Sequence, residues 1–420
     1  MAKEINHFKG DFDDVLRSGS YFIPSAGIIE AWDFSSIYPI VNEYLYEQKE
    51  FLPSRDGKVK EMLDVRTHIK SPYYRCVGGF GRNINIFFLL AEAMWIALGR
   101  KDVDTLTIFN KNMAKYSDDG NCFHAPYGYR MRHYGIQSES VYKNEGSRGL
   151  DQVLESIRLL EENPNTRQVV MSIWNPEFDL GFVTKDMPCN DMVMFKIRDG
   201  YLITTIQNRS NDLHLGLPTN IFQFGFLTEI ISCCLGIKLG TQTHNSQSLH
   251  IYEWNETTKE MYDNVKGGMN NTLYRYCKYI KMDFDFHNIT AVNKFKEVEV
   301  CLDTILENLV VINSGGPEND NIEHVKDFSN WFYYVYQILK IYVLYKNRIV
   351  DKTDEKKDEL RVQSIYAIEE IEKEFNRVID NKDEFFRWDI STLAKNFFYR
   401  RLKNKGLFPL SEDESYLGTL

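Results

Sequence analysis

The stretch Asp186-Met187-Pro188-Cys189-Asn190 is the most informative part of the sequence for chemistry. A cysteine that follows a proline turn and precedes a β-rich run can present its thiol as a nucleophile. Such a thiol needs cationic neighbours that lower its pKa and favour the thiolate. A single cysteine is more often a core residue, so the stretch gains meaning only together with other polar residues.

Polar side chains gather at three places further along the chain. Arg209 and Ser210 combine a planar cation with a hydroxyl, and together they suit a phosphate group. The amide of Asn220 offers both a donor and an acceptor, so it can pair with one edge of a pyrimidine. His250 and Tyr252 are two residues apart in a strand-like segment, which predicts that both rings lie on one face.

Glu92 lies in the apolar run Phe87 to Leu98. A carboxylate in such surroundings costs free energy unless it is protonated or hydrogen-bonded. This placement suits a general acid or base. The alternative is a glutamate on an exposed helix face, which the apolar neighbours Leu90 and Trp95 disfavour.

In this order, the motifs resemble those of the thymidylate synthases and their relatives, the pyrimidine nucleotide hydroxymethylases. The resemblance covers roughly residues 54–265, and it rests on the shared order of short motifs that are each weak alone. The motifs are Arg55-Asp56-Gly57, Glu92-Ala93-Met94-Trp95, Tyr127-Gly128, Arg167, Trp174-Asn175-Pro176, Pro188-Cys189, Gln207 to Asp212, Gly216 to Ile221 and His250-Ile251-Tyr252.

The resemblance implies a folate-dependent one-carbon transfer to C5 of a pyrimidine nucleoside monophosphate. Cys189 would add to C6 of the ring, so that C5 becomes nucleophilic and attacks the one-carbon unit of 5,10-methylenetetrahydrofolate. Glu92 would act as general acid and base through water, and Tyr127 would help to remove the C5 proton. Asn220 favours dUMP, although a flipped amide could pair with cytosine.

The resemblance also assigns binding residues, with no metal. The phosphate would be held by Arg55, Arg167, Arg209 and Ser210, the ribose by His250 and Tyr252, and the folate by Asp212, Gly216 and Tyr116. Arg209 should lower the pKa of the Cys189 thiol. Arg167 would reach the site of a partner subunit, which implies a homodimer. The plainer alternatives are surface ion pairs for the arginines and a turn for Asp212.

Four departures from the family pattern bear on the product. Asn190 stands where thymidylate synthases usually have His, and Gln168 replaces the second of two paired arginines. The stretch Phe109 to Asp118 has no Trp to pack on the folate, and Tyr116 is its nearest aromatic candidate. The chain ends in Tyr416-Leu417-Gly418-Thr419-Leu420, without a recognisable apolar lid.

The missing Trp and lid would let water reach the methylene carried by the pyrimidine after transfer. We therefore favour 5-hydroxymethyl-dUMP over dTMP as the product. Three alternatives stay open: a catalytically silent nucleotide-binding regulatory protein, a CMP or dCMP hydroxymethylase, and a cysteine hydrolase. The pairing of Cys189 with Glu92 favours an enzyme over a binder, and no local His base or oxyanion hole supports a hydrolase.

The elements that must position these residues form an α/β (α+β) pattern. Helices are predicted over Phe87 to Leu98, Leu150 to Glu162 and Ile221 to Leu235, a strand over Val169 to Trp174, and a hairpin over Met192 to Gln207 around Asp199-Gly200. The family architecture is a mixed sheet packed back to back in a homodimer. We expect a catalytic domain over 1–265 and a helical C-terminal extension over 266–420. Helices are predicted in this extension over Val325 to Lys346, Asp354 to Asn376 and Lys382 to Lys403.

Composition limits the class of protein. Of the 420 residues, 43% are hydrophobic and 26% are charged, as is usual for globular domains. The formal net charge of −10 argues against nucleic acid as the main partner. No apolar run is long enough to cross a membrane, and the polar N-terminus does not look like a signal peptide. Seven cysteines without paired spacing predict a cytoplasmic protein with reduced thiols.

Overall fold

The structure is a computed structural model that describes residues 20–77, 82, 84–135, 149–267, 282–350, 352–378 and 389–403. The chain end Tyr416 to Leu420, where no lid was recognised, lies outside these residues.

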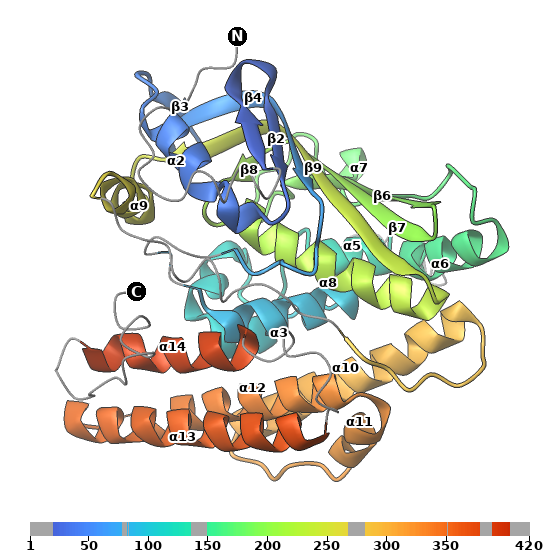
Figure 1. Ribbon diagram of the computed structural model, residues 1–420, viewed down its shortest axis with the longest axis vertical. Helices are drawn as coiled ribbons and strands as arrows, with labels where there is room; N and C mark the ends of the chain where they lie inside the picture. Colours follow the sequence, from blue (N-terminus) through green and yellow to red (C-terminus); the bar gives the residue numbers. More distant parts are fainter. Residues whose placement is uncertain are drawn as a thin grey trace.

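A twisted mixed sheet forms the upper half of the molecule in Figure 1, and in the described residues it has nine strands. The strands are β1 (Tyr21–Ile23), β2 (Ile28–Ala31), β3 (Leu52–Ser54), β4 (Gly57–Ile69), β5 (Val170–Ser172), β6 (Asn190–Arg198), β7 (Tyr201–Asn208), β8 (Asn211–Asp212) and β9 (Lys238–Tyr252). The main path runs β1-β2-β4-β9-β7-β6-β5, while β3 pairs with β4 and β8 pairs with β9. The pairs β2·β4, β7·β9 and β8·β9 are parallel and the others antiparallel. The mixed sheet predicted from the resemblance is therefore confirmed.

The hairpin of β6 and β7 follows from its turn residues. Asp199 and Gly200 have positive φ angles of 53° and 76°. Two central residues with positive φ match the twist of the flanking strands. The predicted hairpin is confirmed, and it fixes the register of β6, which begins directly after Cys189.

Helices cover one face of the sheet. In the order of the chain they are α2 (Tyr38–Tyr46), α3 (Ile86–Ala97), α4 (Val103–Phe109), α5 (Tyr127–Arg132), α6 (Gln152–Glu162), α7 (Pro176–Asp179), α8 (Leu217–Leu235) and α9 (Glu256–Lys266), with short 3-10 turns η1 (Pro24–Ala26), η2 (Phe34–Ser36) and η3 (Lys111–Tyr116). The long helix α8 lies against β7 and β9, and α3 packs on α8 (Figure 1). The predicted helices α3, α6 and α8 are confirmed.

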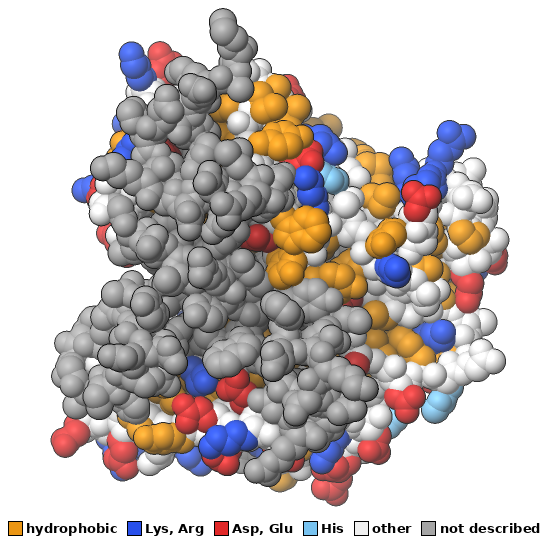
Figure 2. Space-filling view, in the orientation of Figure 1, with side chains coloured by type: hydrophobic (Ala, Val, Ile, Leu, Met, Phe, Trp, Pro, Cys, Tyr) orange, Lys and Arg blue, Asp and Glu red, His pale blue; other side chains and the backbone are white. Residues whose placement is uncertain are grey.

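The C-terminal part of the described chain is helical, and its helices form the layer furthest from the sheet (Figure 1). They are α10 (Ala291–Asn313), α11 (Ile322–Phe328), α12 (Asn330–Arg348), α13 (Asp354–Val378) and α14 (Asp389–Lys403). The prediction of one helix from Val325 to Lys346 is wrong, because Ser329 ends one helix and caps the next by accepting a hydrogen bond from Phe332 N at 3.1 Å. Helix α10 was missed. On the face seen in Figure 2, acidic and basic side chains of the described residues alternate over this layer.

The helical layer shares one hydrophobic core with α3, α8 and strands β5 to β7. Phe87 of α3 stacks on Tyr342 of α12, with ring centroids 4.3 Å apart. The hydroxyl of Tyr342 donates to Phe109 O at 3.1 Å, and Arg132 of α5 pairs with Glu299 of α10 at 2.6 Å. The expectation that the extension packs on the core is confirmed, whereas its division from a catalytic domain at residue 265 stays a prediction.

The opposite face of β5, β6 and β7 is only partly covered by the described residues. Val170 and Tyr201 are exposed, and Met192, Met194 and Ile203 are half-buried. Their alternate neighbours on the same strands point into the core and are fully buried. Back-to-back packing of two copies against this face stays a prediction.

Among the described residues, no helix is both long and apolar enough to span a bilayer. Within the same ranges, no group of three or more His, Cys, Asp or Glu side chains is arranged to hold a metal ion. The cytoplasmic location stays a prediction.

Candidate active site

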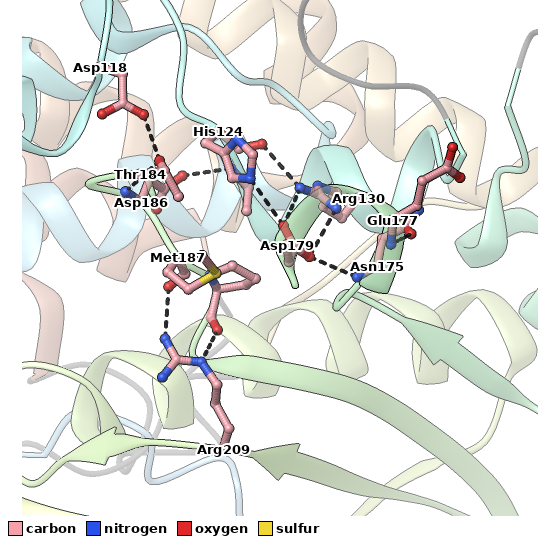
Figure 3. A network of polar contacts seen from close by, with 12 residues as sticks. Asp118, His124, Arg130, Asn175, Glu177, Asp179, Thr184, Asp186, Met187 and Arg209 are labelled. Atoms are coloured by element: carbon pink, nitrogen blue, oxygen red, sulfur yellow. Dashed lines mark hydrogen bonds and ion pairs between the residues drawn. The ribbon is translucent and has the colours of Figure 1, made fainter. Parts of the chain in front are cut away.

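Arg209 holds the loop that carries Cys189. Its Nε donates to Pro188 O at 2.8 Å and its Nη2 to Met187 O at 3.4 Å (Figure 3). Nη2 also lies 4.0 Å from Cys189 Sγ. The backbone N of Arg209 donates to Cys189 O at 3.1 Å, so the end of β7 and the start of β6 are fixed together. The cation is therefore placed directly beside the thiol, as the sequence predicted.

The pKa of the Cys189 thiol results from opposing effects. Burial raises it, and this is the largest effect. Arg209 and Arg55 act in the opposite direction, while the carboxylates of Asp186 and Asp212 add to the increase. The predicted direction of the Arg209 effect is confirmed, but the expectation of a lowered pKa is wrong because burial outweighs it.

Tyr127 lies next to Cys189 and within electrostatic reach of Glu92. The side chain of Glu92 projects from α3 and is hydrogen-bonded to Gln223 of α8, and burial raises its pKa to about 8. Its Oε2 has no partner among the described residues. Tyr127 begins α5, its hydroxyl is hydrogen-bonded to the backbone of Cys189, and burial raises its pKa well above the usual range. A carboxyl group with a pKa near 8 can both take and return a proton near neutral pH.

Asn220 lies in the first turn of α8 and faces Asn190 of β6. Asn190 Nδ2 donates to Asn220 Oδ1 at 3.4 Å, and Asn220 Nδ2 donates to Asn190 Oδ1 at 3.2 Å. Both side chains are buried. The residue that departs from the family pattern thus contacts the residue predicted to read the base.

A second group of predicted residues surrounds strand β8. Asp212 of β8 pairs in register with His250 of β9, and the rings of His250 and Tyr252 meet edge to face with centroids 5.1 Å apart. The predicted common face of His250 and Tyr252 is therefore confirmed. Burial, with Asp212 nearby, raises the pKa of Tyr252 to about 12. Ser210 lies directly between Arg209 and β8.

The loop after Asp212 is held by the same carboxylate. Asp212 Oδ1 accepts hydrogen bonds from the backbone N of His214, at 2.6 Å, and of Leu215. Its Oδ2 is buried and has no partner among the described residues. A Cβ at Gly216 would lie 3.0 Å from both Asn211 Oδ1 and Asp212 N, closer than ordinary packing, so a side chain there requires these neighbours to give way by a few tenths of an ångström.

Helix α2 supports this loop from the N-terminal side. His214 Nε2 donates to Asn42 Oδ1 at 2.9 Å, and its Nδ1 accepts from the hydroxyl of Tyr38. Burial lowers the pKa of His214 to about 3, so the ring is neutral and each nitrogen has one role. Sequence reasoning missed this contact because Tyr38 and His214 are far apart in the chain.

Arg55 is close to the site, although it is exposed. It pairs with its neighbour Asp56, and its Nη1 donates to Thr184 O at 3.3 Å in the loop before Cys189. The end of η3 meets the same loop, because Asp118 accepts from Thr184 Oγ1 at 2.6 Å and from Lys185 N at 3.1 Å (Figure 3).

The family model for thymidylate synthase matches residues 81–308, which is more than half of the chain. The chain belongs to the thymidylate synthase family. The matched range includes every candidate site residue except Arg55.

Three relatives illustrate the similarity. Deoxyuridylate hydroxymethyltransferase of Bacillus phage SP01 is 39% identical over 220 residues, which are 52% of this chain and 57% of the relative. Deoxyuridylate hydroxymethyltransferase of Pseudomonas phage M6 is 36% identical over 203 residues, 48% of this chain and 54% of the relative. Thymidylate synthase 1/2 of Encephalitozoon cuniculi is 32% identical over 176 residues, 40% of this chain and 58% of the relative. The chain spans about half the length of the curated relatives that it matches.

Two residues that the family resemblance assigned to the site, Arg167 and Tyr116, have no contact with Cys189 among the described residues. Arg167 is exposed just before β5. Tyr116 is exposed at the end of η3, with Lys115 Nζ 4.9 Å from its ring centre. Their roles stay predictions. Gln223 was missed, although its spacing from Asn220, one helical turn along α8, places both on one face.

Proposed function

We propose that the chain catalyses folate-dependent one-carbon transfer to C5 of dUMP through a covalent Cys189 adduct, with 5-hydroxymethyl-dUMP as product. The observation that carries the proposal is that one site holds a thiol, a tyrosine hydroxyl and a carboxyl group. The Tyr127 hydroxyl is hydrogen-bonded to the backbone of Cys189 and lies within electrostatic reach of Glu92, and burial raises the pKa of Glu92 to about 8. A protein that only binds a nucleotide has no need for a nucleophile beside a proton-transfer group.

Each residue has a task in the first step. Cys189 Sγ forms a bond to C6, and the electron pair of the C5–C6 double bond moves toward C5 and O4. Glu92, acting through water, supplies a proton to the developing charge at O4. Arg209 fixes the loop and contributes positive charge near the nucleotide phosphate. After transfer, Glu92, assisted by the Tyr127 hydroxyl, takes the C5 proton while the bond from the one-carbon unit to the folate nitrogen breaks; water then adds to the methylene left on C5, and the thiolate leaves as the C5–C6 double bond forms again.

Methylenetetrahydrofolate would supply a one-carbon unit at the oxidation level of formaldehyde. Two features of the chain fit a folate. Asp212 Oδ2 is a buried acceptor without a partner, which suits the donor edge of a pterin. Gly216 keeps the adjoining backbone free of a side chain where one would collide. Tyr116 would pack on the outer part of the same molecule, because η3 is tied to the Cys189 loop.

The chain would act as a homodimer. On the partly covered face of β5, β6 and β7, every second residue along a strand points outward, and several of these residues are apolar. Such a face suits packing against a second copy. Arg167 is exposed three residues before β5, which lies at this face. It is thus free to contact a phosphate bound by the other subunit, as the family pattern implies.

A second candidate function is thymidylate synthesis, in which a hydride reaches the same methylene instead of water. The names of two phage relatives favour hydroxymethylation, while that of the Encephalitozoon cuniculi relative favours thymidylate synthesis. The stretch Phe109 to Asp118 favours water, since it has no Trp to cover the folate.

The test is a product assay with dUMP and methylenetetrahydrofolate. The nucleotide is identified by mass, and dihydrofolate is followed by its absorbance. We expect a hydroxymethyl nucleotide without dihydrofolate from the wild type, and at least a roughly thousandfold loss in Cys189→Ala. Equal amounts of dTMP and dihydrofolate would establish the second candidate. No product from dUMP but turnover of dCMP or CMP would reassign the base. No product from any of these would refute an enzymatic role.

A further inference from the structure

The side chains of Asn190 and Asn220 form a reciprocal pair. Each amide donates one hydrogen bond to the other and accepts one, at 3.4 and 3.2 Å. Asn190 is completely buried and Asn220 is 5% exposed, so bulk water does not compete for these bonds. No other hydrogen bond of either side chain is found among the described residues.

This pairing couples the orientations of the two amides. If Asn220 alone turned by 180°, its NH2 group would face the NH2 group of Asn190, and the two oxygens would face each other. Both hydrogen bonds would be replaced by repulsive contacts inside a buried site. The Asn220 amide can therefore reverse only if the buried Asn190 amide reverses with it.

The pair still leaves Asn220 able to bind a ligand. An amide has two donor hydrogens and two acceptor lone pairs, and the contact with Asn190 uses one of each. One donor and one acceptor remain, and they point to opposite sides of the side chain, so a base contacts one of them. N3 of the base is a donor in uracil and an acceptor in cytosine. The orientation of the Asn220 amide thus decides which base it matches.

We propose that Asn190 is a positioning residue that holds Asn220 in the orientation for uracil and thereby sets the preference for uracil over cytosine nucleotides. This inference rests on the proposed function, because it concerns the base that the same site reads. Cytosine would be accepted only after both amides reverse.

The backbone around Asn190 supports this role. Asn190 is the first residue of β6 and pairs in register with Asn208 of β7, directly after the nucleophile Cys189. Asn220 is fixed by the first turn of α8, where its backbone N donates to Gly216 O at 2.9 Å. Both amides therefore project from rigid elements. A histidine at position 190 would offer a given partner atom either a donor or an acceptor, so it could not hold Asn220 by two complementary bonds.

The test compares the affinity of the full chain for dUMP and dCMP by calorimetry. The variants are Asn190→Ala, which removes both bonds, and Asn190→Ser, which keeps at most one. The control is Asn208→Ala, a second buried asparagine, whose Nδ2 bonds only to the backbone carbonyls of Ile206 and Asn245. We expect the preference for dUMP over dCMP to fall about tenfold in Asn190→Ala, less in Asn190→Ser, and not at all in the control.

The outcomes separate the inference from the proposed function. If the wild type binds dUMP selectively and both Asn190 variants keep the full preference, Asn190 has only a packing role and the inference is wrong. If both Asn190 variants weaken the binding of dUMP and of dCMP by the same factor, the preference is unchanged and the inference is again wrong. A wild type that binds neither nucleotide would overturn the proposed function itself, and the inference with it. A smaller preference in a folded Asn190→Ser protein supports the inference even if Asn190→Ala does not fold.

Discussion

The raised pKa of Glu92 makes a prediction about stability that needs no substrate. Glu92→Gln removes the ionisable group and keeps the shape of the side chain. In the folded protein the Glu92 carboxyl has a pKa of about 8, against 4.5 for an unburied glutamate. The folded state therefore binds the proton more tightly than the unfolded chain. The stability of the wild type is complete below pH 4.5 and is lost progressively as the pH rises toward 8.

The magnitude follows from the two pKa values. If the pKa shift acts in full, a glutamate at position 92 gives a lower free energy of unfolding than a neutral side chain of the same shape. The difference is about 3 kcal/mol at pH 7 and about 5 kcal/mol at pH 9. Relaxation of the protein and water penetration around an ionised buried carboxylate reduce these figures by about half. We expect Glu92→Gln to be more stable than the wild type by about 2 kcal/mol at pH 7, and equal to it at pH 4. For 420 residues this corresponds to about 2 °C in Tm.

The assay is thermal unfolding of both proteins between pH 4 and pH 9. Glu260→Gln, which removes a carboxyl from the exposed face of α9, serves as the control and should follow the wild type at every pH. Activity should move the opposite way, because Glu92→Gln lacks the proton-transfer group and should lose the inflection near pH 8 in kcat/KM. Parallel stability curves for wild type and Glu92→Gln would show that the carboxyl is not held in its neutral form, and would remove the main support for its catalytic role.

Three further predictions address other parts of the site. Asp212→Ala should raise the KM for the folate at least about tenfold and leave dUMP affinity unchanged in calorimetry, because the folate would lose its contact with Oδ2, an acceptor without a partner among the described residues. An equal loss of dUMP affinity would contradict this assignment. A mixture of inactive Cys189→Ala and Arg167→Ala subunits, exchanged under mild denaturant, should recover about a quarter of the wild-type activity, since half of the dimers would hold one complete site; no recovery would argue against a shared site. Tyr38→Phe should cost about 1 kcal/mol in chemical unfolding, because the buried His214 Nδ1 loses its donor, and should raise the folate KM more than that for dUMP; unchanged kinetics would mean that α2 does not position the loop.

Sequence reasoning succeeded where local pattern decides the outcome. The apolar run around Glu92, the Asp199-Gly200 turn and the alternation of His250 and Tyr252 each specify a conformation within a few residues. The order of the motifs then placed Cys189, Arg209 and Asn220 in a common site. Those contacts join residues that come from different elements, and the shared family order was the information that connected them.

Balances between opposing effects and contacts over long sequence distance were not predictable in this way. Arg209 does favour the thiolate, but only the packed structure shows that burial around Cys189 is the larger effect. Asn190 could be read as a departure from a pattern, yet its partner, Asn220, is set by how α8 meets β6. The break at Ser329 depends on the choice between continuing a helix and capping a new one, which the apolar spacing does not distinguish.

The helical extension takes part in placing the Glu92 carboxyl. Glu92 lies between layers: Gln223 of α8 contacts it on the sheet side, while Phe87, on the same helix α3, stacks on Tyr342 of α12 and meets Phe397 of α14 at 5.2 Å. The sheet and the extension therefore fix α3 from two sides. A carboxyl group with a pKa near 8 requires surroundings that exclude water, and the C-terminal helices provide part of those surroundings by covering α3. The helix that carries Glu92 is thus packed from both sides within one hydrophobic core.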